Sequence, residues 1–173
     1  MAAAVAGDRA IAERSIAAER RVTADSFLTQ KLVIWQKRLK LEAWYITFNL
    51  VHPSELKPKT LGNIHWDADV KRASIKILSP EDYKLTFPDA LKDMEFTVVH
   101  ELVHLQLSSL PRNEASRSAE EKAVNTLTEA LLNLDRQQQN AAVVESGSNP
   151  GTGLSAPSSE APSASRGRAP GPR

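Results

Sequence analysis

The first half of the chain carries two different hydrophobic patterns. Between residues 28 and 39, apolar positions recur every three or four residues, which is the spacing of one face of an α-helix. A helix capped by Asp25 or Ser26 is therefore predicted, with the apolar stripe Leu28, Leu32, Trp35 and Leu39. Farther along, apolar and polar residues alternate in three short segments, which predicts half-buried strands. These segments are residues 44–50, 62–66 and 73–77, and the run Asp67-Ala68-Asp69 predicts a turn between the last two.

The second half returns to helical spacing. A helix is expected from about Asp89 to Leu110, and Pro111 ends it. Another helix begins within residues 113–120 and runs to about Asp135, with the apolar stripe Val124, Leu127, Leu131 and Leu134. Because strands and helices are segregated along the chain, the pattern predicts an α+β domain. In it, helices pack on one face of a small mixed sheet of about three strands.

The two ends of the chain differ from this body, which spans residues 24–137. Residues 8–22 contain a near-repeat of short charged segments, so we expect residues 1–23 to be helical or flexible. Beyond about Glu145, Ser, Pro, Gly and Ala dominate and aromatic residues are absent. Such a segment cannot bury enough apolar surface to offset the entropy of ordering it, so residues 138–173 are expected to form a disordered tail.

The composition argues against several classes of protein. Lys and Arg number 22 against 21 for Asp and Glu, so the chain lacks the basic excess of a nucleic-acid binder. It has no cysteine, which excludes disulfides, thiolate metal ligands and cysteine nucleophiles. No apolar run is long enough to span a membrane, and the first residues lack the basic region of a signal peptide. We therefore expect no membrane association and a cytoplasmic location, while the oligomeric state stays open.

The segment His100-Glu101-Leu102-Val103-His104 carries the candidate chemistry. On a helix, residues four apart lie one turn above each other on the same face, so both imidazoles can reach one ion. Glu101 lies beside the first histidine, where its carboxylate could reach a water on that ion without being a ligand. Zinc lowers the pKa of such a water to around 7, and a nearby carboxylate can accept its proton. The pattern therefore predicts a catalytic zinc site.

A catalytic zinc site needs a third protein ligand and an open position. The chain holds two other histidines, His52 and His65, and both precede the motif. A ligand that follows the motif must therefore be a carboxylate. The acidic segment in the last predicted helix offers Glu120 and Glu121.

His100-Glu-Leu-Val-His104 followed by Glu121-Lys-Ala-Val-Asn125 resembles the gluzincin metallopeptidases. The resemblance is strongest to their smallest members, the minigluzincins, and to phage-type and ImmA/IrrE-like zincins. It covers about residues 27–135 and implies a minimal zincin-like domain with an active-site helix and a glutamate helix. It also implies that Glu121 is the third zinc ligand and that Asn125 supports a ligand histidine. In the family, an edge strand above the active-site helix binds an extended peptide, and the sequence leaves open which strand this is.

Some points of this interpretation have alternatives. Glu120 aligns with the apolar stripe of its helix and competes with Glu121 as the ligand. Ser118-Ala-Glu-Glu121 also fits a capping box, in which Glu121 would cap its own helix. Larger gluzincins place a His or Tyr beyond the glutamate helix to stabilise the oxyanion, but neither follows Glu121 here. The upstream candidates for that role are His65 and Tyr83.

The expected function is zinc-dependent hydrolysis of peptide bonds in a peptide or protein substrate. His100, His104 and Glu121 would hold Zn²⁺, and Glu101 would activate water and pass its proton to the leaving amine. Two alternatives keep the metal but change the role. One is a catalytically silent, zinc-stabilised interaction module, and the other is a regulatory zincin that cleaves one specific partner protein.

Overall fold

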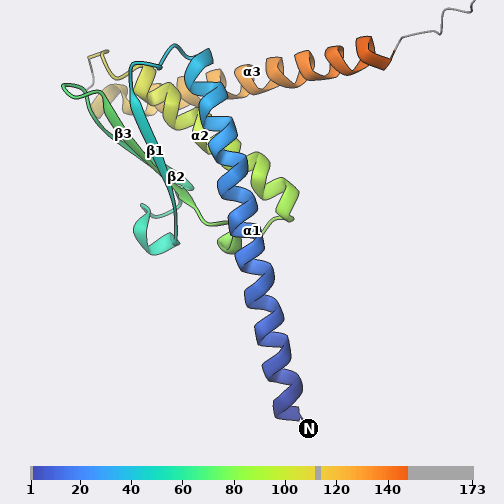
Figure 1. The fold of residues 1–173 in the computed structure, drawn as a ribbon. Coiled ribbons are helices and arrows are strands. Elements are labelled where there is room, and N and C mark those ends of the chain that lie inside the picture. The colour runs from blue at the N-terminus through green and yellow to red at the C-terminus, as the bar shows by residue number, and fades with distance from the viewer. Residues whose placement is uncertain (1, 112–113, 148–173) are drawn as a thin grey trace, which may run out of the picture.

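The described part of the chain folds as three α-helices and a three-stranded sheet, shown in Figure 1. The computed structural model describes residues 2–111 and 114–147. The element order is α1 (Ala2–Arg38), β1 (Tyr45–Val51), β2 (Gly62–Asp67), β3 (Arg72–Leu78), α2 (Phe87–Gln106) and α3 (Glu114–Gly147). Two 3-10 helices, η1 (Pro53–Glu55) and η2 (Pro80–Asp82), follow β1 and β3. The predicted α+β class and the order of one helix, three strands and two helices are confirmed.

The sheet is mixed and has the order β1-β3-β2. The central strand β3 pairs parallel with β1, with Phe48 opposite Ile75, and antiparallel with β2, with Ile64 opposite Ile75. The turn from β2 to β3 is held by Oδ1 of Asp67, which accepts hydrogen bonds from the backbone N–H groups of Asp69 and Val70. Both β1 and β2 are therefore edge strands of this sheet.

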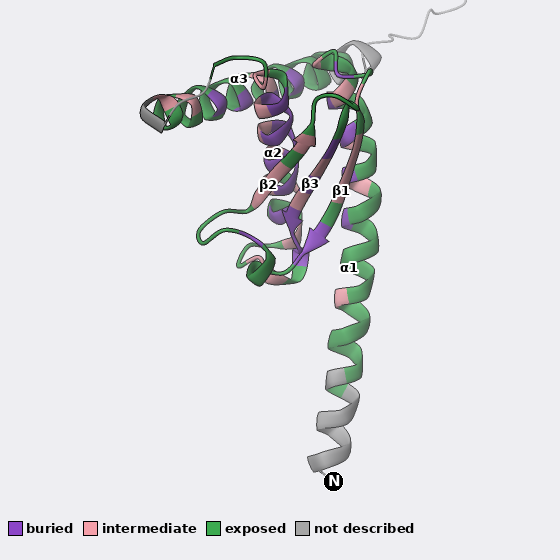
Figure 2. Ribbon diagram, turned by 90° about the vertical axis from the view of Figure 1, so that its left-hand side faces the viewer, coloured by how far each residue is buried: buried purple, intermediate pink, exposed green. Residues whose placement is uncertain are grey.

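The helices cover one face of the sheet, with α2 directly behind it (Figure 2). Ala73, Ile75 and Ile77 of β3 are buried, while Ser74 and Lys76 between them are half-buried. This alternation matches a sheet with one packed face and one open face. The core includes side chains from all three helices and β3, among them Leu28, Trp35, Met94, Val98, Leu102 and Val124.

Two helices are longer than predicted. Helix α1 runs without a break through Asp25 and Ser26, so the predicted start of a separate helix there is wrong. Helix α3 continues to Gly147, so residues 138–147 are helical and the tail predicted to begin at residue 138 does not begin there. The rest of that predicted tail, 148–173, lies outside the described residues. Helix α2, in contrast, ends at Gln106 rather than at Leu110.

The buried face of α3 also differs from the predicted stripe. Val124 is buried and Leu131 is half-buried, but Leu127 and Leu134 are exposed. The face that packs inward instead carries Val124, Thr128, Leu132 and Asp135. No helix in the described part of the chain has an apolar stretch long enough to cross a membrane.

Candidate metal centre

Helix α2 places two histidines at the floor of a pocket. Its buried face packs Val98, Leu102 and Leu105 into the core, so His100 and His104 on the neighbouring face point away from it. The two imidazole rings lie edge to face, with their Nε2 atoms 3.1 Å apart. Their side chains are 16% and 12% exposed, so both rings are largely fixed by packing but still open to the pocket.

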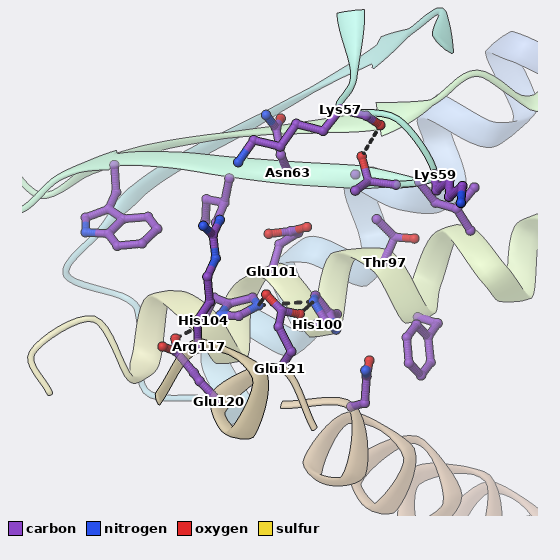
Figure 3. Close-up of a pocket in the computed structure, with 17 residues that line it drawn as sticks. Lys57, Lys59, Asn63, Thr97, His100, Glu101, His104, Arg117, Glu120 and Glu121 are labelled. Atoms are coloured by element: carbon purple, nitrogen blue, oxygen red, sulfur yellow. Dashed lines mark hydrogen bonds and ion pairs between the residues drawn. The ribbon is translucent and has the colours of Figure 1, made fainter. Parts of the chain in front are cut away.

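Helix α3 brings Glu121 to this pair (Figure 3). One carboxylate oxygen, Oε1, lies 3.4 Å from Nε2 of His104, and the other, Oε2, lies 3.6 Å from Nε2 of His100. Zinc bonds of about 2.0–2.1 Å in a tetrahedron place neighbouring ligand atoms about 3.3 Å apart. The distance between the two nitrogens, and the distance from each nitrogen to its nearer carboxylate oxygen, are close to that spacing, so the three side chains could hold one small ion.

Glu120 has a different role from Glu121. Its Oε1 lies 3.2 Å from Nδ1 of His104, on the side of the ring that faces away from the ion position. A carboxylate there accepts a hydrogen bond from Nδ1–H and directs the lone pair of Nε2 toward the ion position. The described residues that could hold the ion together are thus His100, His104 and Glu121, and Glu120 orients one of them. Residues 118–121 lie inside α3, so Glu121 does not cap that helix.

The other histidine of the group, His100, has Asn125 as a polar neighbour in the pocket. Nδ1 of His100 is buried and makes no hydrogen bond within the described part of the chain. Asn125 lies one turn after Glu121 and lines the same pocket, and its polar contact with His100 acts to raise the pKa of that ring. Burial and the neighbouring His104 lower the pKa of His100, which favours the neutral ring that a metal needs.

Glu101 lies beneath β2, above the two histidines (Figure 3). It is only 7% exposed, and burial, followed by repulsion from Glu121, raises the pKa of its carboxyl to about 7. A hydrogen bond from the backbone of Ile64 and the charge of Lys57 act in the opposite direction. A cation bound by the histidines would also lower this pKa. The Glu101 carboxyl is therefore buried beside the ion position without being part of the donor set.

Strand β2 passes unusually close to α2. A Cβ atom at Gly62 would collide with the Thr97 methyl group and lie 2.9 Å from the carbonyl oxygen of Lys76. Glycine is therefore required where β2 crosses α2. The close approach forms a pocket of about 800 Å³ between the two elements, with the histidines at its base.

The two oxyanion candidates from the sequence do not reach this pocket. His65 is exposed on β2, and Tyr83 packs against the core instead of lining the pocket. Burial, with the nearby charge of Asp93, raises the pKa of the Tyr83 hydroxyl, so it stays protonated. Neither residue is placed to stabilise an anion at the histidine pair.

The pocket also contains residues that sequence reasoning missed. Arg117 from α3 and Lys57 and Lys59 from the loop before β2 line it, together with Trp66 at the far end of β2. Helical periodicity could have indicated Arg117, because it lies one turn before Glu121 on the same helix face. No sequence pattern indicates that Lys57 and Lys59 line the pocket, since their positions depend on the path of an irregular loop.

A second group of His and acidic residues lies away from the pocket. His52, Glu81 and Asp82 are close enough to share an ion. Nδ1 of His52 already pairs with Oδ2 of Asp82 at 2.8 Å, and Glu81 pairs with Arg21 at 2.9 Å. The arginine supplies the positive charge that an ion would bring, so this group is satisfied without a metal.

No family model, curated protein or solved structure matches the chain. The interpretation of the site therefore rests on its geometry. This geometry shows a group of two histidines and one glutamate that can hold a metal ion, with a buried carboxyl beside it and an edge strand above it.

Proposed function

We propose that this chain is a zinc-dependent metallopeptidase whose catalytic site is the group His100, His104 and Glu121, with Glu101 as the general base. One observation carries the proposal. Two imidazole nitrogens lie 3.1 Å apart, and each lies 3.4 or 3.6 Å from one oxygen of the Glu121 carboxylate, so donors from two helices converge on one ion position with a buried carboxyl next to it. A purely structural group would not require that carboxyl to face an 800 Å³ pocket.

The donor set favours zinc over the common hard cations. Two imidazole nitrogens and one carboxylate suit Zn²⁺, whereas Ca²⁺ and Mg²⁺ prefer six or more oxygen ligands. Three protein ligands would leave one position of a tetrahedral ion open for water or substrate, and these three side chains line the pocket. When bound there, zinc supplies a water whose pKa is about 7 and polarises the carbonyl of the scissile bond.

Separate side chains of the protein have separate roles in the proposed reaction. Glu101 takes up the proton of the attacking water and delivers it to the nitrogen of the leaving amine. Glu120 holds the His104 ring in the orientation and tautomer in which Nε2 faces the ion. The close contact between β2 and α2 at Gly62 limits access of bulk water to Glu101.

The substrate class follows from β2. This strand is at the edge of the sheet, and its residues Gly62, Asn63, Ile64 and Trp66 line the pocket. An extended peptide can add to such an edge through backbone hydrogen bonds, which fix the scissile bond relative to Glu101 without requiring a particular sequence. A peptide bond in an extended segment is therefore the expected target.

The test compares the wild-type chain with Glu101→Gln, both loaded with zinc. The proposal predicts about one zinc per chain in each protein and hydrolysis of a mixture of unstructured peptides by the wild type alone. Equal hydrolysis by both proteins would refute the role of Glu101. Tight zinc binding without cleavage of any peptide or protein by the wild type would refute the peptidase proposal and leave a silent zinc-stabilised module.

A further inference from the structure

Three cationic side chains border the candidate catalytic pocket. Arg117 rises from α3 past His104 toward β2, and Lys57 extends along β2 beside Asn63 (Figure 3). Lys59 lies at the other end, near Thr97 (Figure 3). The cations thus come from two segments far apart in the sequence and meet at the rim of one pocket.

None of these three cations is neutralised by an ion pair within 4 Å among the described residues. This is notable for Arg117, because Glu120 and Glu121 follow it three and four residues later, at the spacing that normally pairs charges on a helix. Both glutamates instead face the histidines, at 3.2 Å for Glu120 and at 3.4 and 3.6 Å for Glu121. Arg117 is therefore left facing the pocket with its full charge.

The charge balance of the pocket also favours a negatively charged ligand. Among the described residues, its lining includes three carboxyl groups, Glu101, Glu120 and Glu121, and the formal charges of the three cations match theirs. A divalent ion at the histidines would leave the pocket positive. The potential would be strongest between the ion and the rim, where a substrate has to lie.

We propose that the substrate carries a carboxylate close to the scissile bond and that Arg117 and Lys57 bind this carboxylate. The inference rests on the proposed peptidase function and adds the chemistry of the substrate. The planar guanidinium of Arg117 can form two parallel hydrogen bonds with a carboxylate, while Lys57 adds a compact charge on the β2 side. The required carboxylate has two sources, an Asp or Glu side chain or the free C-terminus of a peptide.

The test uses peptide hydroxamates, which bind to the open side of a catalytic zinc and require no turnover. Three probes share one sequence and differ in charge. One carries Gln and a C-terminal amide, the second replaces Gln by Glu, and the third keeps Gln but has a free C-terminus. Binding to zinc-loaded Glu101→Gln is measured by calorimetry. We expect at least one charged probe to bind about fivefold to tenfold more tightly than the neutral probe at low salt, with the difference shrinking at high salt.

Variants then assign the preference to residues. In the Glu101→Gln background, Arg117→Gln and Lys57→Gln should each reduce the ratio of charged to neutral binding toward 1. The matched control is Lys84→Gln, which removes the same charge from an exposed residue that does not line the pocket and should keep the ratio. Tighter binding of the Glu probe assigns the preference to an acidic side chain, and tighter binding of the free-acid probe assigns it to a C-terminus.

Two outcomes would overturn the inference, and they are distinguishable. Equal binding of all three probes to the zinc-loaded protein would overturn the carboxylate preference and leave the peptidase proposal standing. Absence of zinc from the protein, or of binding by every probe, would overturn both proposals. A preference that Arg117→Gln and Lys57→Gln leave unchanged would also refute the assignment of these residues.

Discussion

The two adjacent glutamates of α3 should differ sharply in their effect on metal binding. Each oxygen of Glu121 faces Nε2 of one histidine, at 3.4 and 3.6 Å, whereas Glu120 touches the opposite nitrogen of His104 at 3.2 Å. Glu121→Gln removes a charged ligand. If a zinc-binding free energy of about 10–16 kcal/mol is shared among four ligands, the loss is roughly 3 kcal/mol, or about a hundredfold in zinc affinity.

Glu120→Gln should be milder, because the amide oxygen can still accept the hydrogen bond from Nδ1–H of His104. Loss of such an orienting partner typically weakens metal binding about tenfold to a hundredfold, and we expect the lower end for this conservative change. Glu129→Gln makes the same change at an exposed position of the same helix, outside the pocket, and should leave zinc affinity unchanged.

The assay is competition with a chromophoric zinc chelator at pH 7, with circular dichroism to confirm that each variant is folded. The expected order of zinc affinity is wild type and Glu129→Gln, then Glu120→Gln, then Glu121→Gln. Equal affinities for the two site variants, or a greater loss in Glu120→Gln, would refute the assignment of Glu121 as the ligand.

Two further predictions concern the scaffold. Gly62→Ala should lower the free energy of unfolding by about 1–3 kcal/mol in urea titrations, because the new methyl group meets the Thr97 side chain and the Lys76 carbonyl; an unchanged midpoint would contradict the close approach of β2. Burial raises the pKa of Asp135, but hydrogen bonds from Arg38 and Gln139 outweigh this and leave the pKa below its usual value. The ionised form therefore stabilises the fold above about pH 4, and this stabilisation is lost as the pH falls through the lowered pKa of the folded state. The difference in stability between wild type and Asp135→Asn should shrink from pH 7 to pH 3 in thermal melts, and a difference independent of pH would refute the argument.

Local patterns were sufficient for the sheet and for the central helix. The alternation around Phe48, Ile64 and Ile75 predicts the three strands, because one face of each strand packs against the core while the other faces outward. The apolar stripe of α2 likewise leaves His100 and His104 on a neighbouring face. These features depend on the periodicity of short segments and do not depend on how distant segments meet.

The errors at the ends of helices have a simple physical cause. No Gly or Pro occurs between Asp8 and Arg38, so nothing in that stretch stops a helix, and Asp25 is tolerated within it. Helix α3 similarly continues through Gln- and Ala-rich sequence to Gly147. The prediction gave too much weight to weak capping signals and to overall polarity.

The third ligand could not be settled from the sequence. Glu120 and Glu121 are adjacent, so they point about 100° apart on the helix, and the rotation of α3 about its axis decides which one meets the histidines. That rotation is set by Val124, Thr128 and Leu132, which pack inward. The predicted stripe contains Leu127, whereas the buried face carries Thr128. The helix face predicted to pack inward was therefore wrong by one residue, or about 100° of rotation.

The central claim is that two histidines and one glutamate hold a catalytic zinc. Zinc X-ray absorption spectroscopy on the wild-type chain loaded with one equivalent of zinc tests it most directly. We predict a four-coordinate site with bonds of about 2.0–2.1 Å, two imidazole ligands and two oxygen ligands, and the loss of one imidazole contribution in His104→Ala. Zinc that fails to bind stoichiometrically, or that binds without imidazole ligands, would contradict the account.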